Sequence, residues 1–341
     1  MNRIDLNSRE RILLVRLSSL GDIVHTLPAL AALRRKKPQT RISWLVEPVG
    51  ARLLQNFSGI DQVISIQLKE KGRLGNIHDL LSKWRGHFDL IVDFQGLLKS
   101  ALLCRLLGSQ TLGFARSNLR EALAAVFYRY QAPPFPEKEH VIKKNLHLLS
   151  ALEIEADRIE YPLAPGPVSF QLQTFFKENQ LEKGSWLAVN SGGGWPSKVL
   201  DGDRLSMVVA DLMRDLRPVL FYGNESERRL CLEVTERTGC LLAPSLDFPD
   251  LIHFLESASV LLSADTLALH LADALGKPSV AYFGPSSPRR NGSLLPGSIS
   301  LIHQIPCSFC YRRKCDKMTC MQALKVEEIS AAVRSLHEQS N

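Results

Sequence analysis

The 341-residue sequence has no apolar run long enough to cross a bilayer, and its first ten residues, MNRIDLNSRE, are polar. The apolar segment that follows is short and contains Arg16, so we expect no signal peptide. Low-complexity tracts are also missing, and 45% of the residues are hydrophobic. These features predict a cytoplasmic globular protein of two ordinary-sized domains.

Three nucleotide-binding signatures are missing as well. No G-x-G-x-x-G follows the first predicted strand of either half, which argues against a nicotinamide-dependent dehydrogenase. No G-x-x-x-x-G-K-[ST] is present, which excludes a P-loop kinase. No Asp-x-Asp pair ends a strand, so we expect no metal-bridged diphosphate and no cofactor. A bound diphosphate would then be neutralised by Lys198 and by helix dipoles.

Acidic residues are scarce in the first half of the chain. Residues 1–165 contain 24 Lys and Arg against 16 Asp and Glu, whereas the remainder contains 18 against 19. This excess predicts an anionic partner, either a phosphorylated lipid or an acidic sugar, although a solvated basic face is an equally ordinary explanation. No nucleic-acid-binding motif accompanies the charge, so we expect no nucleic-acid partner.

Four of the seven cysteines lie within fourteen residues, at Cys307, Cys310, Cys315 and Cys320. Their C-x2-C-x4-C-x4-C spacing does not match a standard zinc ribbon or ferredoxin. A structural metal site, reduced thiols and a local disulfide all stay open.

Strand and helix patterns alternate along both halves. Apolar strands are predicted at residues 12–17, 41–47, 61–66 and 88–95, and amphipathic helices lie between or after them. The proline-rich segment YPLAPGPVS, residues 161–169, is typical of a linker, and the alternation resumes after it. We therefore predict an α/β fold with a doubly wound domain over 1–165 and a second over 166–325, facing each other across a cleft. A final helix over 326–341 is expected to cross back to the first domain.

The first strand runs into the turn SSLGD, residues 18–22, and a helix predicted from Ile23 to near Pro38. Ligands of open α/β sheets bind where strands end in this way. Gly21 would let backbone amides approach a phosphate, but Asp22 brings a carboxylate to the same place. An N-cap role for Asp22 is an equally good explanation from the residues alone.

Strand ends in the second half carry groups suited to phosphate and ribose. Ser191 and Gly192 begin a Gly-rich turn with exposed backbone donors, and Lys198 supplies a positive charge. Glu227 follows another strand at a spacing suited to ribose hydroxyls, and Asp265 and Thr266 open a helix that carries His270. Each loop alone is weak evidence, because such residues are commonly turns, surface charges, N-caps or half-buried histidines; the repetition at one sheet edge favours a nucleotide-diphosphate site.

Several segments together resemble the ADP-heptose:lipopolysaccharide heptosyltransferases, glycosyltransferase family 9. They match in order over nearly the whole chain. The matching segments are SSLGDIVHTLPAL, DFQGLLKSALL, GGGWPSK, SADTLALHLADALGKP and FGPSSPRRNG. The segments VHTLPAL and REALAAVFY are more similar to heptosyltransferase I than to heptosyltransferase II.

The resemblance implies the GT-B architecture of two Rossmann-like domains and an inverting, metal-independent transfer of heptose from ADP-heptose to the Kdo/heptose inner core of lipopolysaccharide. It implies that Asp22 is the general base. In the second domain it implies that Lys198 binds the phosphates, Glu227 the ribose and Asp265 the sugar hydroxyls, with Thr266, Leu267 and His270 near the diphosphate. Contacts to the anionic lipid A–Kdo acceptor are expected in the first domain, from Arg16, Ser19, Gly21, Lys99, Arg116, Arg120 and Arg129.

One position departs from the family pattern, which has Asp-Thr-Gly or Asp-Ser-Gly where this chain has Leu267 after Asp265 and Thr266. A side chain there stands where a phosphate would approach. Two alternatives therefore stay open: transfer of another nucleotide sugar onto a surface glycan, and a paralogue that binds a nucleotide sugar or lipid without turnover. The resemblance also implies a location on the cytoplasmic face of the inner membrane.

Overall fold

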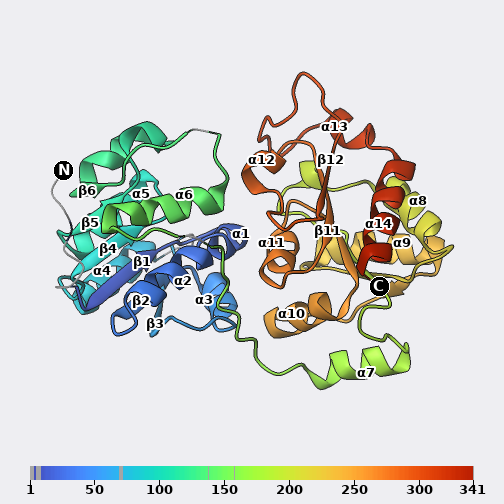
Figure 1. The fold of residues 1–341 in the computed structure, drawn as a ribbon, viewed down its shortest axis with the longest axis horizontal. Coiled ribbons are helices and arrows are strands. Elements are labelled where there is room, and N and C mark those ends of the chain that lie inside the picture. The colour runs from blue at the N-terminus through green and yellow to red at the C-terminus, as the bar shows by residue number, and fades with distance from the viewer. Residues whose placement is uncertain (1–3, 5–8, 69–71, 137, 157, 341) are drawn as a thin grey trace. The chain divides into compact units, whose positions relative to one another are not determined.

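The computed structural model describes residues 4, 9–68, 72–136, 138–156 and 158–340. The chain divides into two compact units, Met1–Ala164 and Pro165–Asn341 (Figure 1). No helix in the described part of the chain has the length and apolar character needed to span a membrane.

The first unit is a six-stranded parallel sheet in the order β3-β2-β1-β4-β5-β6. Its strands are β1 (Arg11–Val15), β2 (Arg41–Val46), β3 (Gln62–Ser65), β4 (Leu90–Asp93), β5 (Thr111–Gly113) and β6 (Tyr130–Gln131). Its helices are α1 (Leu20–Val24), α2 (Leu27–Lys36), α3 (Pro48–Leu54), α4 (Arg73–Trp84), α5 (Leu98–Leu107) and α6 (Val141–Leu148), with 3₁₀ turns η2 (Arg116–Asn118), η3 (Ala122–Phe127) and η4 (Leu149–Leu152).

Helices cover both faces of this sheet. Apolar side chains of β1, α4 and α5, among them Leu13, Leu80 and Leu103, form one buried cluster with the sheet. Helices α2 and α6 pack together and lie in front of the sheet in Figure 1. Because both faces are covered, the central strands are largely apolar: β1 is apolar after Arg11, and β4 is apolar up to Asp93.

The second unit repeats this plan with the order β12-β11-β10-β7-β8-β9, again all parallel. Its strands are β7 (Leu187–Asn190), β8 (Pro218–Phe221), β9 (Leu241–Leu242), β10 (Val260–Ala264), β11 (Ser279–Phe283) and β12 (Ile299–Ile302). Its helices are α7 (Phe170–Glu178), α8 (Gly202–Leu212), α9 (Glu225–Thr238), α10 (Phe248–Ser257), α11 (Leu267–Ala274), α12 (Pro288–Asn291), α13 (Thr319–Gln322) and α14 (Val326–Ser340), with the 3₁₀ turn η5 (Pro196–Lys198).

Both units therefore have the strand order of a doubly wound Rossmann-like sheet, and the predicted α/β fold class is confirmed. The strands that the sequence did not predict are β5, β6, β9 and β12, which lie at or near the sheet edges and are four residues long at most. Short edge strands carry little apolar periodicity, which explains why the sequence pattern missed them.

The helix predicted from Ile23 to near Pro38 is two helices, α1 and α2, with a break at His25 and Thr26. Pro28 explains the break, because a proline cannot donate the hydrogen bond that would continue α1 and its ring would meet the carbonyl four residues earlier. The break leaves α1 as a single short helix that carries Asp22.

The expectation that the final helix crosses to the first domain is wrong. Helix α14 packs against α8, β10 and β11 of the second unit, where Ile329, Val333 and Leu336 are buried in its core. Arg334 adds ion pairs to Asp211 (3.0 Å) and Asp215 (2.7 Å). The apolar face of α14 is thus buried within its own unit, because the helix covers one face of the second sheet.

Candidate functional site

The strand order places the candidate loops at the two topological switch points. In the first unit β1 lies beside β4, and in the second β7 lies beside β10. At these positions the connections leave the sheet in opposite directions and open a crevice at the carboxyl ends of the strands. Asp22 follows β1, and Asp265 follows β10.

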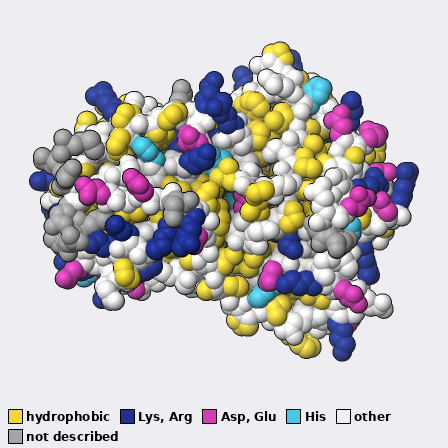
Figure 2. Space-filling view, in the orientation of Figure 1, with side chains coloured by type: hydrophobic (Ala, Val, Ile, Leu, Met, Phe, Trp, Pro, Cys, Tyr) yellow, Lys and Arg dark blue, Asp and Glu magenta, His cyan; other side chains and the backbone are white. Residues whose placement is uncertain are grey.

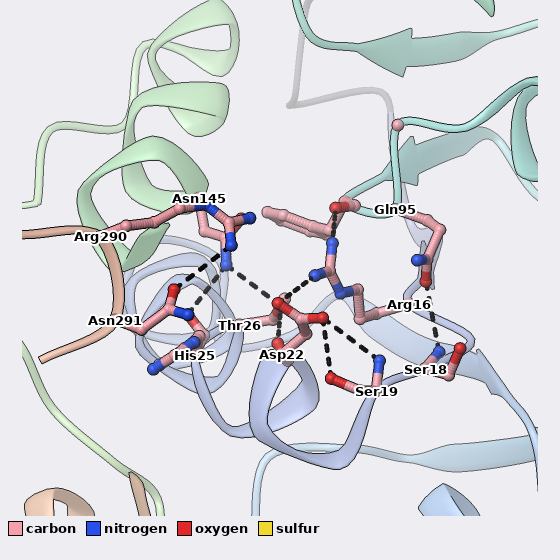
Figure 3. A network of polar contacts seen from close by, with 12 residues as sticks. Arg16, Ser18, Ser19, Asp22, His25, Thr26, Gln95, Asn145, Arg290 and Asn291 are labelled. Atoms are coloured by element: carbon pink, nitrogen blue, oxygen red, sulfur yellow. Dashed lines mark hydrogen bonds and ion pairs between the residues drawn. The ribbon is translucent and has the colours of Figure 1, made fainter. Parts of the chain in front are cut away.

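Asp22 is held by two neighbours in the turn after β1 (Figure 3). Its Oδ1 forms an ion pair with Nη2 of Arg16 at 2.7 Å, and its Oδ2 accepts hydrogen bonds from the Ser19 hydroxyl (2.9 Å) and the Ser19 amide (3.3 Å). Ser19, and not Asp22, is the N-cap of α1. The Asp22 side chain is 27% exposed and that of Arg16 only 8%, so the carboxylate is accessible while its cationic partner is buried.

The loop after β4 supports the turn that carries Asp22. Gln95 Oε1 accepts hydrogen bonds from the amides of Leu17 (3.0 Å) and Ser18 (3.2 Å), and Arg16 Nη1 donates to the Phe94 carbonyl (Figure 3). These contacts join the two loops of the switch point into one structure.

Asp93 in turn fixes that loop from inside the first unit. The side chain is fully buried and accepts hydrogen bonds from the Gln95 amide, the Ser100 hydroxyl and the Tyr128 hydroxyl, each at 2.8 Å. Burial raises the pKa of Asp93, and the hydrogen bonds from Tyr128 and Ser100 act in the opposite direction. Neither Asp93 nor Gln95 was assigned a role from the sequence, although Asp93 ends a buried strand and Gln95 follows it by two residues, and a polar residue at such a place is a usable signal.

The remaining acceptor candidates divide by exposure. Arg16 is buried behind Asp22, and Gly21 lies inside α1, where its carbonyl accepts the His25 amide. The other four are exposed side chains on or near α5, η2 and η3, namely Lys99, Arg116, Arg120 and Arg129. Figure 2 shows further Lys and Arg side chains spread over the visible face of the first unit.

In the second unit, Lys198 and Asp265 form a buried ion pair. Lys198 Nζ lies 2.7 Å from Asp265 Oδ2 and 3.1 Å from the Asp265 carbonyl, and the two side chains are 12% and 3% exposed. His270 Nε2 lies 3.4 Å from Oδ1, and the Asn291 amide donates to Oδ2 at 3.1 Å. Burial would raise the pKa of Asp265, but the hydrogen bond from His270 and the charge of Lys198 outweigh it and hold this pKa well below its usual value.

A second set of contacts links the loops after β7 and β10. The Asn190 side chain donates to Thr266 Oγ1 at 2.8 Å and to Ser263 Oγ at 3.0 Å, and its Oδ1 accepts the Gly192 amide at 3.1 Å. Asn190 and Asn291 are thus site residues that the sequence did not single out. Asn190 is the last residue of the buried strand β7, so the sequence again offered a polar residue at the end of an apolar strand as a signal.

The turn at Ser191 and Gly192 differs from its prediction. Both residues are buried, the Ser191 hydroxyl faces Cys231 Sγ at 2.9 Å, and the Gly192 amide is already bonded, so these two do not present exposed donors. Gly192 instead makes room for Glu227, since a Cβ at this position would lie 2.2 Å from the Glu227 carboxyl carbon. The Glu227 carboxylate also accepts the Gly223 amide at 2.7 Å. Leu267, half-buried, is the first residue of α11.

None of the seven cysteines forms a disulfide. Among the described residues, no three His, Cys, Asp or Glu side chains are arranged to hold a metal ion, and this includes the thiols of Cys307, Cys310, Cys315 and Cys320.

Comparison with known proteins identifies the family of this chain. The model of glycosyltransferase family 9 (heptosyltransferase) matches residues 77–321. Lipopolysaccharide heptosyltransferase 1 of Pseudomonas aeruginosa is 29% identical over 326 residues, covering 89% of this chain and 87% of the relative. The enzyme of the same name from Campylobacter coli is 26% identical over 340 residues, covering 96% and 98%.

Solved structures of heptosyltransferases have the same fold as this chain. The E. coli heptosyltransferase WaaC with ADP superposes with a TM-score of 0.75 at 21% identity, covering 97% of this chain and all of that one. The same enzyme was also solved with ADP-2-deoxy-2-fluoro heptose, with a TM-score of 0.73 at 19% identity and the same coverage. The GT-B class of the fold is therefore confirmed, and because the family model covers well over half of the sequence, this chain belongs to glycosyltransferase family 9.

Proposed function

We propose that this glycosyltransferase moves heptose from ADP-heptose to the Kdo/heptose inner core of lipopolysaccharide and inverts the anomeric centre. The names of its relatives and the ligands of WaaC support this choice of acceptor and donor. In the reaction, an acceptor hydroxyl oxygen forms a bond to the anomeric carbon. The bond from that carbon to the diphosphate breaks, ADP leaves with the electron pair, and the hydroxyl proton passes to a base. No metal or other cofactor takes part.

Asp22 is our general base, and its geometry is the observation that carries the proposal. The carboxylate is partly exposed at the switch point of the first unit, and Arg16 and Ser19 fix its orientation. A base must be held within hydrogen-bond reach of the hydroxyl that it deprotonates, and a fixed, accessible carboxylate meets that need. Buried Arg16 then acts as a positioning residue for Asp22 rather than as a contact to the acceptor.

Donor binding is assigned to the second unit. The Lys198 ammonium has three N–H groups, of which Asp265 accepts two. The ammonium also lies 4.3 Å from the centre of the Trp195 ring, and we assign its third N–H group to a diphosphate oxygen. Since the Asp265 side chain is 3% exposed and occupied by its partners, we assign it to orienting Lys198 and His270 instead of binding sugar hydroxyls. Glu227 is assigned to the ribose, and Thr266, Leu267 and the start of α11 to the diphosphate.

The acceptor is assigned to the first unit. Exposed Lys99, Arg116, Arg120 and Arg129 are the proposed contacts to its carboxylates and phosphates. Because such an acceptor is anchored in a bilayer, the protein is expected to act at the cytoplasmic face of the inner membrane.

The test is transfer from ADP-heptose to a Kdo-bearing lipid A, measured as a mass increase of one heptose. Asp22→Asn should lower the rate by about 10²- to 10⁴-fold while ADP affinity is kept, since only the proton acceptor is lost. Asp89→Asn is the matched control, because Asp89 also pairs with an arginine, Arg11 at 3.0 Å, but at the opposite end of β1.

The outcomes separate the alternatives. An active Asp22→Asn variant contradicts the assignment of the base. ADP-heptose binding without transfer indicates another acceptor or a protein that binds without turnover. Absence of ADP-heptose binding indicates another nucleotide sugar, with Leu267 as the first residue to change.

A further inference from the structure

Helix α5 and the turn η3 expose aliphatic side chains on one surface of the first unit. This α5–η3 surface consists of Leu98, Leu102, Leu106, Leu123 and Val126, whose side chains are 39–69% exposed. The three leucines of α5 recur every fourth residue, which places them on one helix face, while Leu103, Cys104 and Leu107 fill the core from the other. Leu123 and Val126 are three residues apart in a 3₁₀ turn and so also share a face.

The two elements are neighbours, so the exposed side chains form one surface. Helix α5 packs against η3, and the Leu98 amide donates to the Glu121 carboxylate at 2.7 Å. Single exposed leucines are ordinary on a protein surface, but a group of five on adjoining elements is typical of a contact site.

The segment that contains α5 and η3 carries charge almost entirely of one sign. Residues 98–130 contain five Lys and Arg and a single acidic residue, Glu121, whose carboxylate is taken up by the start of α5. All five basic side chains are exposed: Lys99, Arg105, Arg116, Arg120 and Arg129. Exposed aliphatic side chains accompanied by exposed Lys and Arg are the combination that binds the interface of an anionic bilayer.

The surface begins next to the candidate base. Leu98 is three residues from Gln95, whose side chain binds the amides of Leu17 and Ser18 in the turn that carries Asp22. Contact with a bilayer through α5 and η3 would therefore bring that turn towards a sugar attached to a lipid in the same bilayer.

We propose that the α5–η3 surface docks this enzyme on an anionic membrane, with the aliphatic side chains entering the headgroup region and the flanking arginines binding lipid phosphates. The proposal rests on the proposed function in one respect, namely that the acceptor lies in the membrane. The alternative occupant, another protein or a second copy of this chain, is an outcome of the test below.

The experiment is sedimentation of the full chain with vesicles of phosphatidylethanolamine and phosphatidylglycerol, compared with neutral phosphatidylcholine vesicles. The triple variant Leu102→Ser, Leu123→Ser, Val126→Ser should lower partitioning onto the anionic vesicles by about tenfold or more, because it removes three aliphatic side chains from the contact. Met207→Ser is the matched control, since Met207 is 54% exposed on α8 of the second unit, and its partitioning should equal that of the wild type.

A second measurement does not depend on how well the triple variant folds. Val126→Trp should show a blue shift of its added fluorescence on anionic vesicles, relative to the wild type. Equal partitioning of the wild type and the triple variant, or no blue shift, overturns the proposal. A change in oligomeric state of the triple variant with unchanged vesicle binding also overturns it, and assigns the surface to a protein partner.

Failure of the proposed function has a different signature. If heptose is transferred to neither a vesicle-embedded nor a deacylated, water-soluble acceptor, the proposed function fails, while the vesicle result still decides the docking surface. If both acceptors react, the ratio of embedded to soluble rates should fall in the triple variant about as much as its vesicle binding.

Discussion

The ion pair of Lys198 with Asp265 can be tested by replacing Lys198 with Met, which keeps the aliphatic stem and removes the charge. The variant leaves the Asp265 carboxylate 3% exposed, with His270 and Asn291 as remaining partners. Breaking a buried pair from one side costs about 3–5 kcal/mol, and since two partners remain we expect about 2–3 kcal/mol here. For a unit of this size, that loss lowers the melting temperature by roughly 5–10 °C.

A surface pair provides the control for this measurement. Lys183 lies 2.9 Å from Glu256 in the same unit, but the two side chains are 68% and 44% exposed. Solvent screens such a pair, so Lys183→Met should cost about 0–1 kcal/mol.

The pH dependence gives a second, independent readout. In the wild type the pKa of Asp265 lies below its ordinary value of 3.8, so its contribution to stability is present above that pH and is lost as the pH falls below it. In the Lys198→Met variant the charge of Lys198 no longer opposes the effect of burial, so the pKa of Asp265 is higher than in the wild type. The stability difference between the two proteins should therefore be largest near neutral pH and shrink as the pH is lowered.

Two results would refute this reasoning. One is a loss of stability in Lys198→Met no larger than that in Lys183→Met, and the other is a difference that does not change with pH. Adding Asp265→Asn to the Lys198→Met variant should restore part of the lost stability, because it removes the buried charge.

Two further substitutions test how the loops are built. Gly192→Ala should weaken ADP binding by about tenfold in calorimetry, because its Cβ displaces the Glu227 carboxylate, whereas Gly194→Ala, which has open space around it, should not; equal affinities would contradict this role for Glu227. Gln95→Ala should lower kcat by about tenfold with ADP affinity unchanged, because two amides of the turn that carries Asp22 lose their acceptor; an unchanged kcat would show that this turn holds its geometry without Gln95.

The α/β class followed from the sequence because buried parallel strands are mostly apolar, and β1, β4, β7 and β10 are of this kind. Asp22, Lys198, Glu227 and Asp265 were also singled out from the sequence as candidates, because each follows a buried strand or the turn after it. The short edge strand β9 and the break between α1 and α2 were missed. Strand β9 has too few residues to show the alternation of apolar and polar residues typical of a strand. The helix break depends on a single proline, Pro28, within a continuous apolar pattern.

The sequence did not show which charged side chains pair with one another. Asp265 and Lys198 were assigned to different parts of a donor, yet they are 67 residues apart and bind each other. Arg16 was expected to contact an acceptor and is instead buried behind Asp22. Only folding brings such residues together, because contacts between strand ends depend on strand order and not on separation along the chain.

The sequence by itself determined which loops are candidates for a site, since an apolar strand followed by a charged or glycine-rich turn is a local pattern. The tertiary structure alone decided what each charge does. Whether a carboxylate is accessible, as that of Asp22 is, or buried against a cation, as that of Asp265 is, depends on packing between segments far apart in sequence.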